Sequence, residues 1–97
     1  MIRLQIQSDS QEAAFDLVRS ALAAEACRLQ LGLEATQRHL HTFEERYCVT
    51  SEVFLREFTA ESLTGGDQEY VAWAGELQLY HRIAAQLDTL RDVQYAA

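Results

Sequence analysis

The sequence predicts an all-α protein in which two long helices form an antiparallel hairpin around a short corner helix. The chain of 97 residues has no Pro and only four Gly, and these are the residues that interrupt helices most often. Ala and Leu are its commonest residues, and apolar positions recur at steps of three and four along two long segments. A chain of this length is expected to form a single helical domain, 1–97, with a modest core.

The start of the chain is the one place where a strand pattern occurs. Residues 1–7 alternate apolar and polar side chains, with Ile2, Leu4 and Ile6 on one side. A lone strand leaves its backbone groups unpaired, so its partner would be the same strand of a second subunit or a strand of another protein. A frayed terminus and an early helical turn are the alternatives that the sequence leaves open.

The first long helix is predicted for residues 9–46, with Ser8 or Asp9 able to cap its start. Gly32 is its weak point, because Gly costs about 1 kcal/mol relative to Ala inside a helix. A break at Gly32, giving two helices, is therefore the main alternative. The apolar stripe of this helix has heptad-like spacing and falls at Phe15, Val18, Leu22, Ala26, Leu29, Leu33, Thr36, Leu40, Phe43 and Tyr47.

A short corner helix is predicted to begin after Thr50 and to end near Ala60. The Thr50 hydroxyl can accept a hydrogen bond from the backbone of the first turn. Val49 precedes this cap and Phe54 follows it by four residues, which is the spacing of a hydrophobic staple.

A second long helix is predicted after the loop SLTGGDQ, in which Gly65 and Gly66 can take positive φ. Asp67 is expected to cap this helix, which continues to about Val93. Its apolar stripe falls at Tyr70, Trp73, Leu77, Tyr80, Ile83, Leu87 and Leu90.

The two predicted helices differ in length, roughly 57 Å against roughly 40 Å at 1.5 Å per residue. The amino-terminal part of the first stripe should therefore overhang the second helix and remain uncovered. An uncovered apolar stripe favours self-association into a helical dimer or docking onto another protein. The residues expected to make that contact are Phe15, Val18 and Leu22.

Aromatic side chains of the predicted stripes should gather where the hairpin turns, because aromatic residues at helical spacing are usually part of a core. We expect one aromatic cluster there, supported by the cap and the staple. The residues of this structural corner are Phe43, Tyr47, Val49, Thr50, Phe54, Phe58, Tyr70 and Trp73.

The negative charge is concentrated in the middle third of the chain. The whole chain carries a net charge of −7, of which residues 44–76 hold eight acids and two Arg, or −6. Such a surface repels phosphate and disfavours nucleic acid, whereas it attracts a basic partner. The acids expected to meet that partner are Glu44, Glu45, Glu52, Glu57, Glu61, Asp67 and Glu69. A well-solvated corner, with some of these acids complementing helix dipoles, is the alternative.

Local motifs give no support for metal binding or catalysis. His39 and His41 lie two residues apart on a helix and point in diverging directions, and Cys48 lies two turns beyond His41. No CxxC, HExxH, GxSxG or Gly-rich phosphate loop occurs. We therefore expect no enzyme activity, no metal and no cofactor. Cys27, inside the first helix, is expected to be a small buried hydrophobe.

The segments FEERYCVTSEVFLREF and GGDQEYVAWAGELQLY resemble a family of small acidic helical proteins from bacteria and archaea. The family pattern is approximately Phe-Glu-x-x-Tyr-Gly-x-Ser/Thr-x-x-x-Phe, then a Gly/Asp-rich turn and a Trp-x-x-Glu helix, and the resemblance covers about residues 29–90. Cys48 departs from it, because Gly at that position would be the left-handed residue that ends the first helix. The matching residues are Phe43, Glu44, Tyr47, Thr50, Phe54, Phe58, Asp67, Trp73 and Glu76.

Most members of that family are uncharacterised, and some are encoded beside toxin-like proteins, so the resemblance implies an antitoxin-like role. The function we predict is accordingly a non-enzymatic module that binds a basic partner protein such as a toxin. A second hypothesis is a DNA-binding regulator, because RLQIQSDSQEAAFDLV resembles the strand and helix of ribbon–helix–helix repressors. A plain helical scaffold is a third. MIRLQIQSDS lacks the apolar core of a signal peptide and no segment is long enough to span a membrane, so we expect a cytoplasmic protein.

Overall fold

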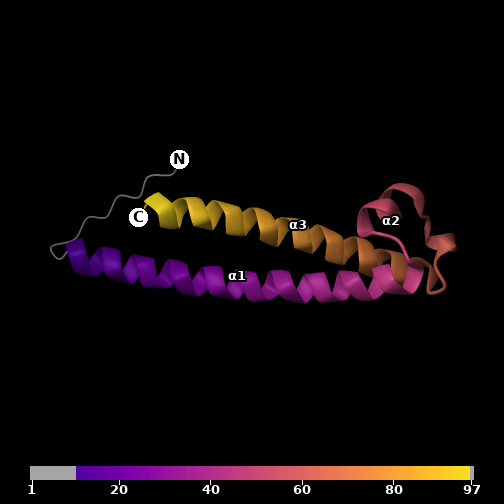
Figure 1. Ribbon diagram of the computed structural model, residues 1–97, viewed down its shortest axis with the longest axis horizontal. Coiled ribbons are helices and arrows are strands. Elements are labelled where there is room, and N and C mark those ends of the chain that lie inside the picture. Colours follow the sequence, from indigo (N-terminus) through magenta and orange to yellow (C-terminus); the bar gives the residue numbers. More distant parts are fainter. Residues whose placement is uncertain (1–10, 97) are drawn as a thin grey trace.

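The protein is an all-α helical hairpin, seen in a computed structural model that describes residues 11–96 (Figure 1). Two long helices run antiparallel and side by side, and the short elements lie together at the end where the chain turns. The molecule is elongated, measuring 62 × 21 × 19 Å along its principal axes. Its elements in chain order are α1 (Gln11–Tyr47), α2 (Ser51–Glu57), the 3-10 turn η1 (Ala60–Ser62) and α3 (Gly66–Ala96). The predicted fold class is confirmed, and the strand predicted for residues 1–7 lies outside the described residues.

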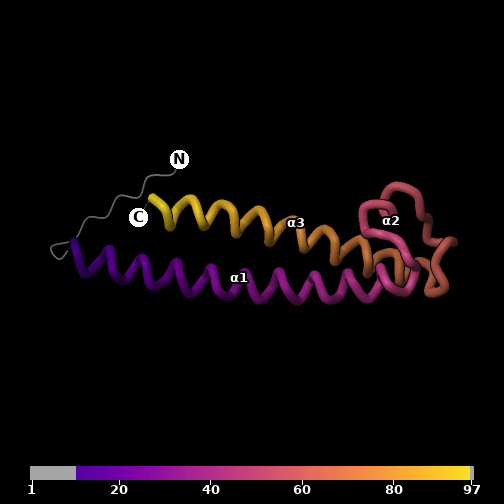
Figure 2. Tube along the Cα trace, in the orientation of Figure 1, coloured from indigo at the N-terminus to yellow at the C-terminus, as the bar shows by residue number. Residues whose placement is uncertain are grey.

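Helix α1 runs without a break through Gly32, as its even path in Figure 2 shows. A Cβ added at Gly32 would lie 3.5 Å from Cδ1 of Ile83, which is an ordinary van der Waals contact. The packed apolar stripe outweighs the propensity cost of one glycine, because tertiary burial supplies most of the stability of helices in proteins. Every position of the two predicted stripes is buried or half-buried, so both stripes are confirmed.

The pairing of α1 with α3 corrects the predicted overhang. Gly32 lies beside Ile83, and His39 pairs with Glu76 further along, so the antiparallel register is fixed. Extending this register places Leu22 opposite the last turn of α3, because α3 has 31 residues and ends at Ala96 rather than near position 93. Leu22 was therefore wrongly predicted to be uncovered. The part of α1 that extends past α3 is short and includes Phe15, which is half-buried.

Helix α1 ends in a Schellman turn built on a cysteine. Cys48 has a φ of 56°, in the left-handed region, and the N–H of Val49 donates to the carbonyl of Glu44 at 3.3 Å. This six-to-one hydrogen bond is the signature of the motif. Cys48 thus adopts the left-handed conformation that was expected of a Gly at this position.

Helix α2 begins as predicted and ends earlier. The hydroxyl of Thr50 accepts a hydrogen bond from the N–H of Val53 at 3.3 Å. The helix stops at Glu57, and the chain is extended at Phe58 before η1, so the single corner helix predicted to reach Ala60 is two short elements. Asp67, predicted as a cap, lies in the first turn of α3 rather than before it.

The core is densest at the corner, where α2 packs on both long helices. Trp73 and Phe54 are completely buried, and their rings stack with centroids 3.8 Å apart and planes 5° apart. The Phe43 ring is also nearly parallel to Trp73, at 5.3 Å. Other members of the predicted corner pack against this cluster and are half-buried: Tyr47, Val49, Phe58 and Tyr70. Cys27 is exposed, so its predicted burial is wrong: it lies on α1 next to the stripe position Ala26.

Candidate interaction site

A buried hydrogen-bond network ties the three helices together at the corner. Ser51, only 1 % exposed, accepts a hydrogen bond from the indole Nε1 of Trp73 at 3.0 Å. Its hydroxyl donates to Oε2 of Glu44 at 2.8 Å, and its backbone N–H donates to the same oxygen at 2.8 Å. Residues of α1, α2 and α3 are thus joined through one serine, and the buried indole N–H and the buried hydroxyl both have partners.

A second polar contact closes the turn between α1 and α3. The hydroxyl of Tyr47 donates to Oε1 of Glu69 and accepts the N–H of Thr64 at 3.0 Å. Arg46 lies 3.1 Å from the other oxygen of Glu69. A Cβ on Gly65 would lie only 2.7 Å from Cβ of Glu69, so this turn requires glycine for space.

The acids predicted to bind a partner divide into two groups. Glu44 and Glu69 are half-buried and already bonded within the corner, so they are less exposed to a partner than the other acids. The remaining five are exposed, namely Glu45, Glu52, Glu57, Glu61 and Asp67. Glu45 pairs with His41 at 3.0 Å, and Glu57 lies 3.6 Å from Arg56. The other three exposed acids differ from these two, because no cation of residues 11–96 pairs with Glu52, Glu61 or Asp67.

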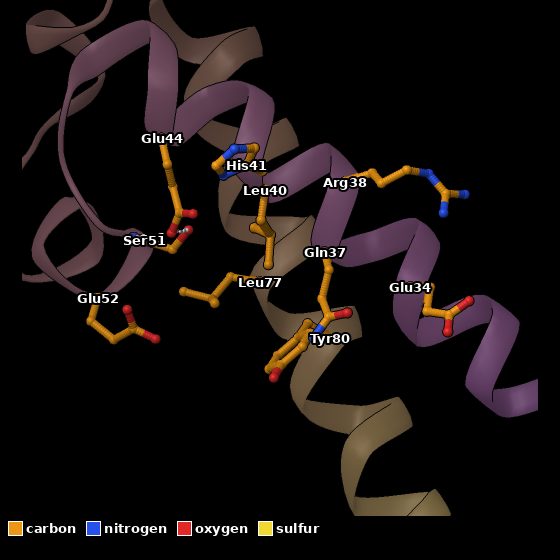
Figure 3. A pocket seen from close by; sticks show the side chains of 10 residues that line it. All are labelled: Glu34, Gln37, Arg38, Leu40, His41, Glu44, Ser51, Glu52, Leu77 and Tyr80. Carbon is orange, nitrogen blue, oxygen red and sulfur yellow. Dashed lines mark hydrogen bonds between the residues drawn. The ribbon is translucent and has the colours of Figure 1, made fainter.

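An open groove of about 620 Å³ lies beside α2, between α1 and α3 (Figure 3). Its floor is apolar and includes Leu40, Leu77 and Tyr80, whereas its carboxylates come from α1 and α2. The full lining is Glu34, Gln37, Arg38, Leu40, His41 and Glu44 from α1, Ser51 and Glu52 from α2, and Leu77 and Tyr80 from α3. The groove was not predicted, because it depends on where α2 rests on the hairpin.

A smaller apolar groove of about 390 Å³ follows the outer side of α3 next to α2. It is lined by Leu55 and Val71, which are 53 % and 67 % exposed. These side chains lie outside the stripes that the sequence patterns identified. The sequence indicated them only as large apolar residues that lie outside the predicted buried faces.

The histidines confirm the predicted divergence around α1. His39 Nδ1 lies 3.2 Å from Oε1 of Glu76 on α3, whereas His41 contacts Glu45 on α1 itself. The second oxygen of Glu76 is buried and has no hydrogen-bond partner in residues 11–96. Among these residues no group of three or more His, Cys, Asp or Glu side chains could hold a metal ion.

Titration is perturbed at one surface pair far from the corner. Two hydrogen bonds from the guanidinium of Arg28 lower the pKa of the exposed Glu25 carboxyl, and the charge of Arg28 adds to that effect. The same contacts raise the pKa of Arg28. This pair is a local feature of α1 and contributes nothing to the groove.

Each helix within residues 11–96 is either too short or too polar to cross a bilayer. No family model, curated protein or solved structure matches the chain. The resemblance over residues 29–90 therefore stays a prediction.

Proposed function

We propose that this protein is a non-enzymatic protein–protein interaction module, antitoxin-like in role, that binds a basic partner protein through its acidic corner. The observation that carries the proposal is the excess of exposed, unpaired carboxylates at that corner. Residues 44–76 carry a net charge of −6, and no cation in the described part of the chain pairs with Glu52, Glu61 or Asp67.

The corner also has the stiffness that a binding surface benefits from. Trp73, Ser51 and Glu44 are joined by hydrogen bonds in the core, and the turn is closed by Tyr47 and Glu69. A surface that is already ordered loses less conformational entropy when a partner binds. Exposed carboxylates on such a frame attract a basic protein and raise the rate of encounter.

The test is co-expression of the chain with the product of the neighbouring gene, followed by co-purification and binding kinetics. In the variant Glu61→Gln/Asp67→Asn, two corner charges are removed without touching the buried network. We expect the association rate to fall roughly tenfold at low salt, because unscreened exposed charges mainly set that rate.

The matched control is Asp88→Asn/Asp92→Asn, which removes the same charge from exposed positions near the end of α3. Its association rate should stay within about twofold of the unmodified chain, since both positions lie roughly 30 Å or more along α3 from Asp67, which is about the Debye length at low salt. Failure to form any complex with the neighbouring product, or equal effects of both variants, would contradict the proposal.

Self-association through the amino-terminal stripe of α1 stays a prediction. Phe15 and Val18 are half-buried, and the overhang that motivated a dimer is shorter than expected. Light scattering coupled to size exclusion measures the outcome, and a strict monomer at micromolar concentration contradicts the dimer.

A further inference from the structure

The groove beside α2 combines an apolar floor with an acidic rim. Leu40 and Leu77 belong to the buried core, yet both line the groove together with the half-buried Tyr80. The carboxylates of Glu44 and Glu52 come from two different helices. A ligand that fills this groove must therefore offer apolar atoms to the floor and positive charge to the rim.

Glu44 is a carboxylate held in place with one oxygen still available. Its Oε2 accepts both hydrogen bonds from Ser51, whereas its Oε1 accepts none from residues 11–96. The buried side-chain oxygens and nitrogens without partners in that part of the chain are limited to Oε2 of Glu76, so Oε1 of Glu44 reaches solvent on a residue that lines this groove and a smaller hollow beside Thr50. An acceptor fixed in this way costs little to reorganise when a donor arrives.

The positive groups of the chain that border the groove do not neutralise this rim. Figure 3 shows Arg38 reaching away from Glu44 and Glu52. His41 contacts Glu45 at 3.0 Å. The groove thus keeps an acidic rim, which would attract a positively charged group of another molecule.

We propose that this groove is the docking site for an arginine side chain carried on an amphipathic segment of the partner protein. The inference rests on the proposed function and specifies which side chain of the partner enters the groove. The aliphatic stem of arginine suits Leu40 and Leu77, and its planar guanidinium stacks on aromatic rings such as Tyr80. Its five donors can also address the open oxygen of Glu44 and the carboxylate of Glu52 together.

A second copy of the chain is a poorer occupant than a basic protein. Each chain carries −7, and the groove is lined by three carboxylates against one Arg, so two copies that meet at this surface repel one another. Charge complementarity therefore favours a positively charged partner in the groove.

The first experiment measures binding of a synthetic 14-residue helical peptide of Ala and Leu with one central Arg, by NMR titration of the full chain. We expect saturable shifts at the Trp73 indole, the Ser51 amide and the Tyr80 ring. The same peptide with citrulline, which has the shape of Arg without the charge, should bind at least tenfold more weakly, a difference of about 1.4 kcal/mol. Equal binding of the two peptides, or shifts spread evenly over the exposed acids, would overturn the proposal.

The matched variant is Glu44→Gln/Glu52→Gln, because a glutamine at position 44 can still accept both hydrogen bonds of Ser51 while the charge is lost. Its peptide affinity should fall at least tenfold, while Asp88→Asn/Asp92→Asn stays within about twofold. A thermal melt establishes that the groove variant is folded. If the Arg peptide binds this variant as tightly as the unmodified chain, the groove is not the site.

Kinetics with the co-purified partner separate this inference from the proposed function. The groove variant should speed dissociation at least tenfold, because truncating a docked charge pair acts on the dissociation rate. The corner variant Glu61→Gln/Asp67→Asn should instead slow association. A complex that responds to the corner variant alone overturns the groove and leaves the proposed function standing. If no complex forms, the proposed function fails, and saturable binding of the Arg peptide still supports the groove.

Discussion

The indole N–H of Trp73 donates to the hydroxyl of Ser51 at 3.0 Å inside a corner where both side chains are buried. One bond thereby links α3 to the first residue of α2, and the same serine passes the link on to Glu44 in α1. The stability of the corner should consequently depend on a residue that has no large apolar side chain.

Ser51→Ala should lower the free energy of unfolding by about 1–3 kcal/mol, because the Trp73 donor is left buried without an acceptor. Urea denaturation followed by Trp73 fluorescence measures the change. The control is Ser20→Ala, an exposed position on α1, for which we expect a change of about 0.5 kcal/mol or less. Equal denaturation midpoints for Ser51→Ala and the unmodified chain would show that the network adds no stability.

Gly65→Ala should be destabilising, because the added Cβ would meet Glu69 at 2.7 Å where that side chain is held by Tyr47 and Arg46. We expect a loss of about 1–3 kcal/mol, as for other overpacked sites. Gly75→Ala is the matched control, since nothing lies within 4 Å of its added Cβ in the middle of α3. That change should raise stability by about 1 kcal/mol through helix propensity, and thermal unfolding by circular dichroism measures both signs.

Cys48→Gly should stabilise the protein by about 0.5–1 kcal/mol. Its φ of 56° costs an L-residue about 1–2 kcal/mol, and part of that gain is offset by the greater freedom of glycine in the unfolded chain. Cys27→Gly, on an exposed face within α1, should have the opposite sign and a similar size. Chemical denaturation of both variants under reducing conditions is the measurement, and two changes of the same sign would refute the assignment.

Arg28→Ala should raise the pKa of Glu25, because hydrogen bonds from Arg28 hold that pKa below its usual range. A carboxyl whose pKa is depressed by folding stabilises the protein above its unfolded pKa, and this contribution is lost as the pH falls through the folded pKa. The variant should therefore lose less stability than the unmodified chain when the pH falls from the unfolded pKa of Glu25 through its lowered folded pKa. An NMR titration of the Glu25 carboxyl checks the direction, with Arg82→Ala as a control that should leave it unchanged.

The parts of the fold that the sequence predicted are those that depend on neighbouring residues. The Thr50 cap and the two stripes are set by contacts within a helix or by burial periodicity, and all three are confirmed. The residues at which the helices end were less predictable. Phe58 leaves α2 because it turns its ring toward Phe54 and Tyr47, and that packing is a tertiary effect.

The candidate site was harder to predict because its residues meet only through the hairpin. Ser51 and Trp73 are 22 residues apart. No local spacing in the sequence indicates that Ser51 bonds both Trp73 and Glu44. Glu44 looked like a solvated acid until its two hydrogen bonds to Ser51 were located. Leu55 lies beside Phe54 in sequence but is 53 % exposed, since only one face of a seven-residue helix can rest on the core.

The turn contacts between Tyr47 and its partners have a consequence for how the chain orders itself. Thr64 and Glu69 bond to Tyr47 across only 17 and 22 residues, whereas pairs such as Gly32 and Ile83 enclose a longer loop. The entropic cost of closing a loop grows with loop length. Folding should therefore start at the corner, and the pairing of α1 with α3 should then extend from the corner toward the chain ends. In the folded state, amide exchange should be slowest near Trp73 and should quicken steadily toward the free ends of α1 and α3.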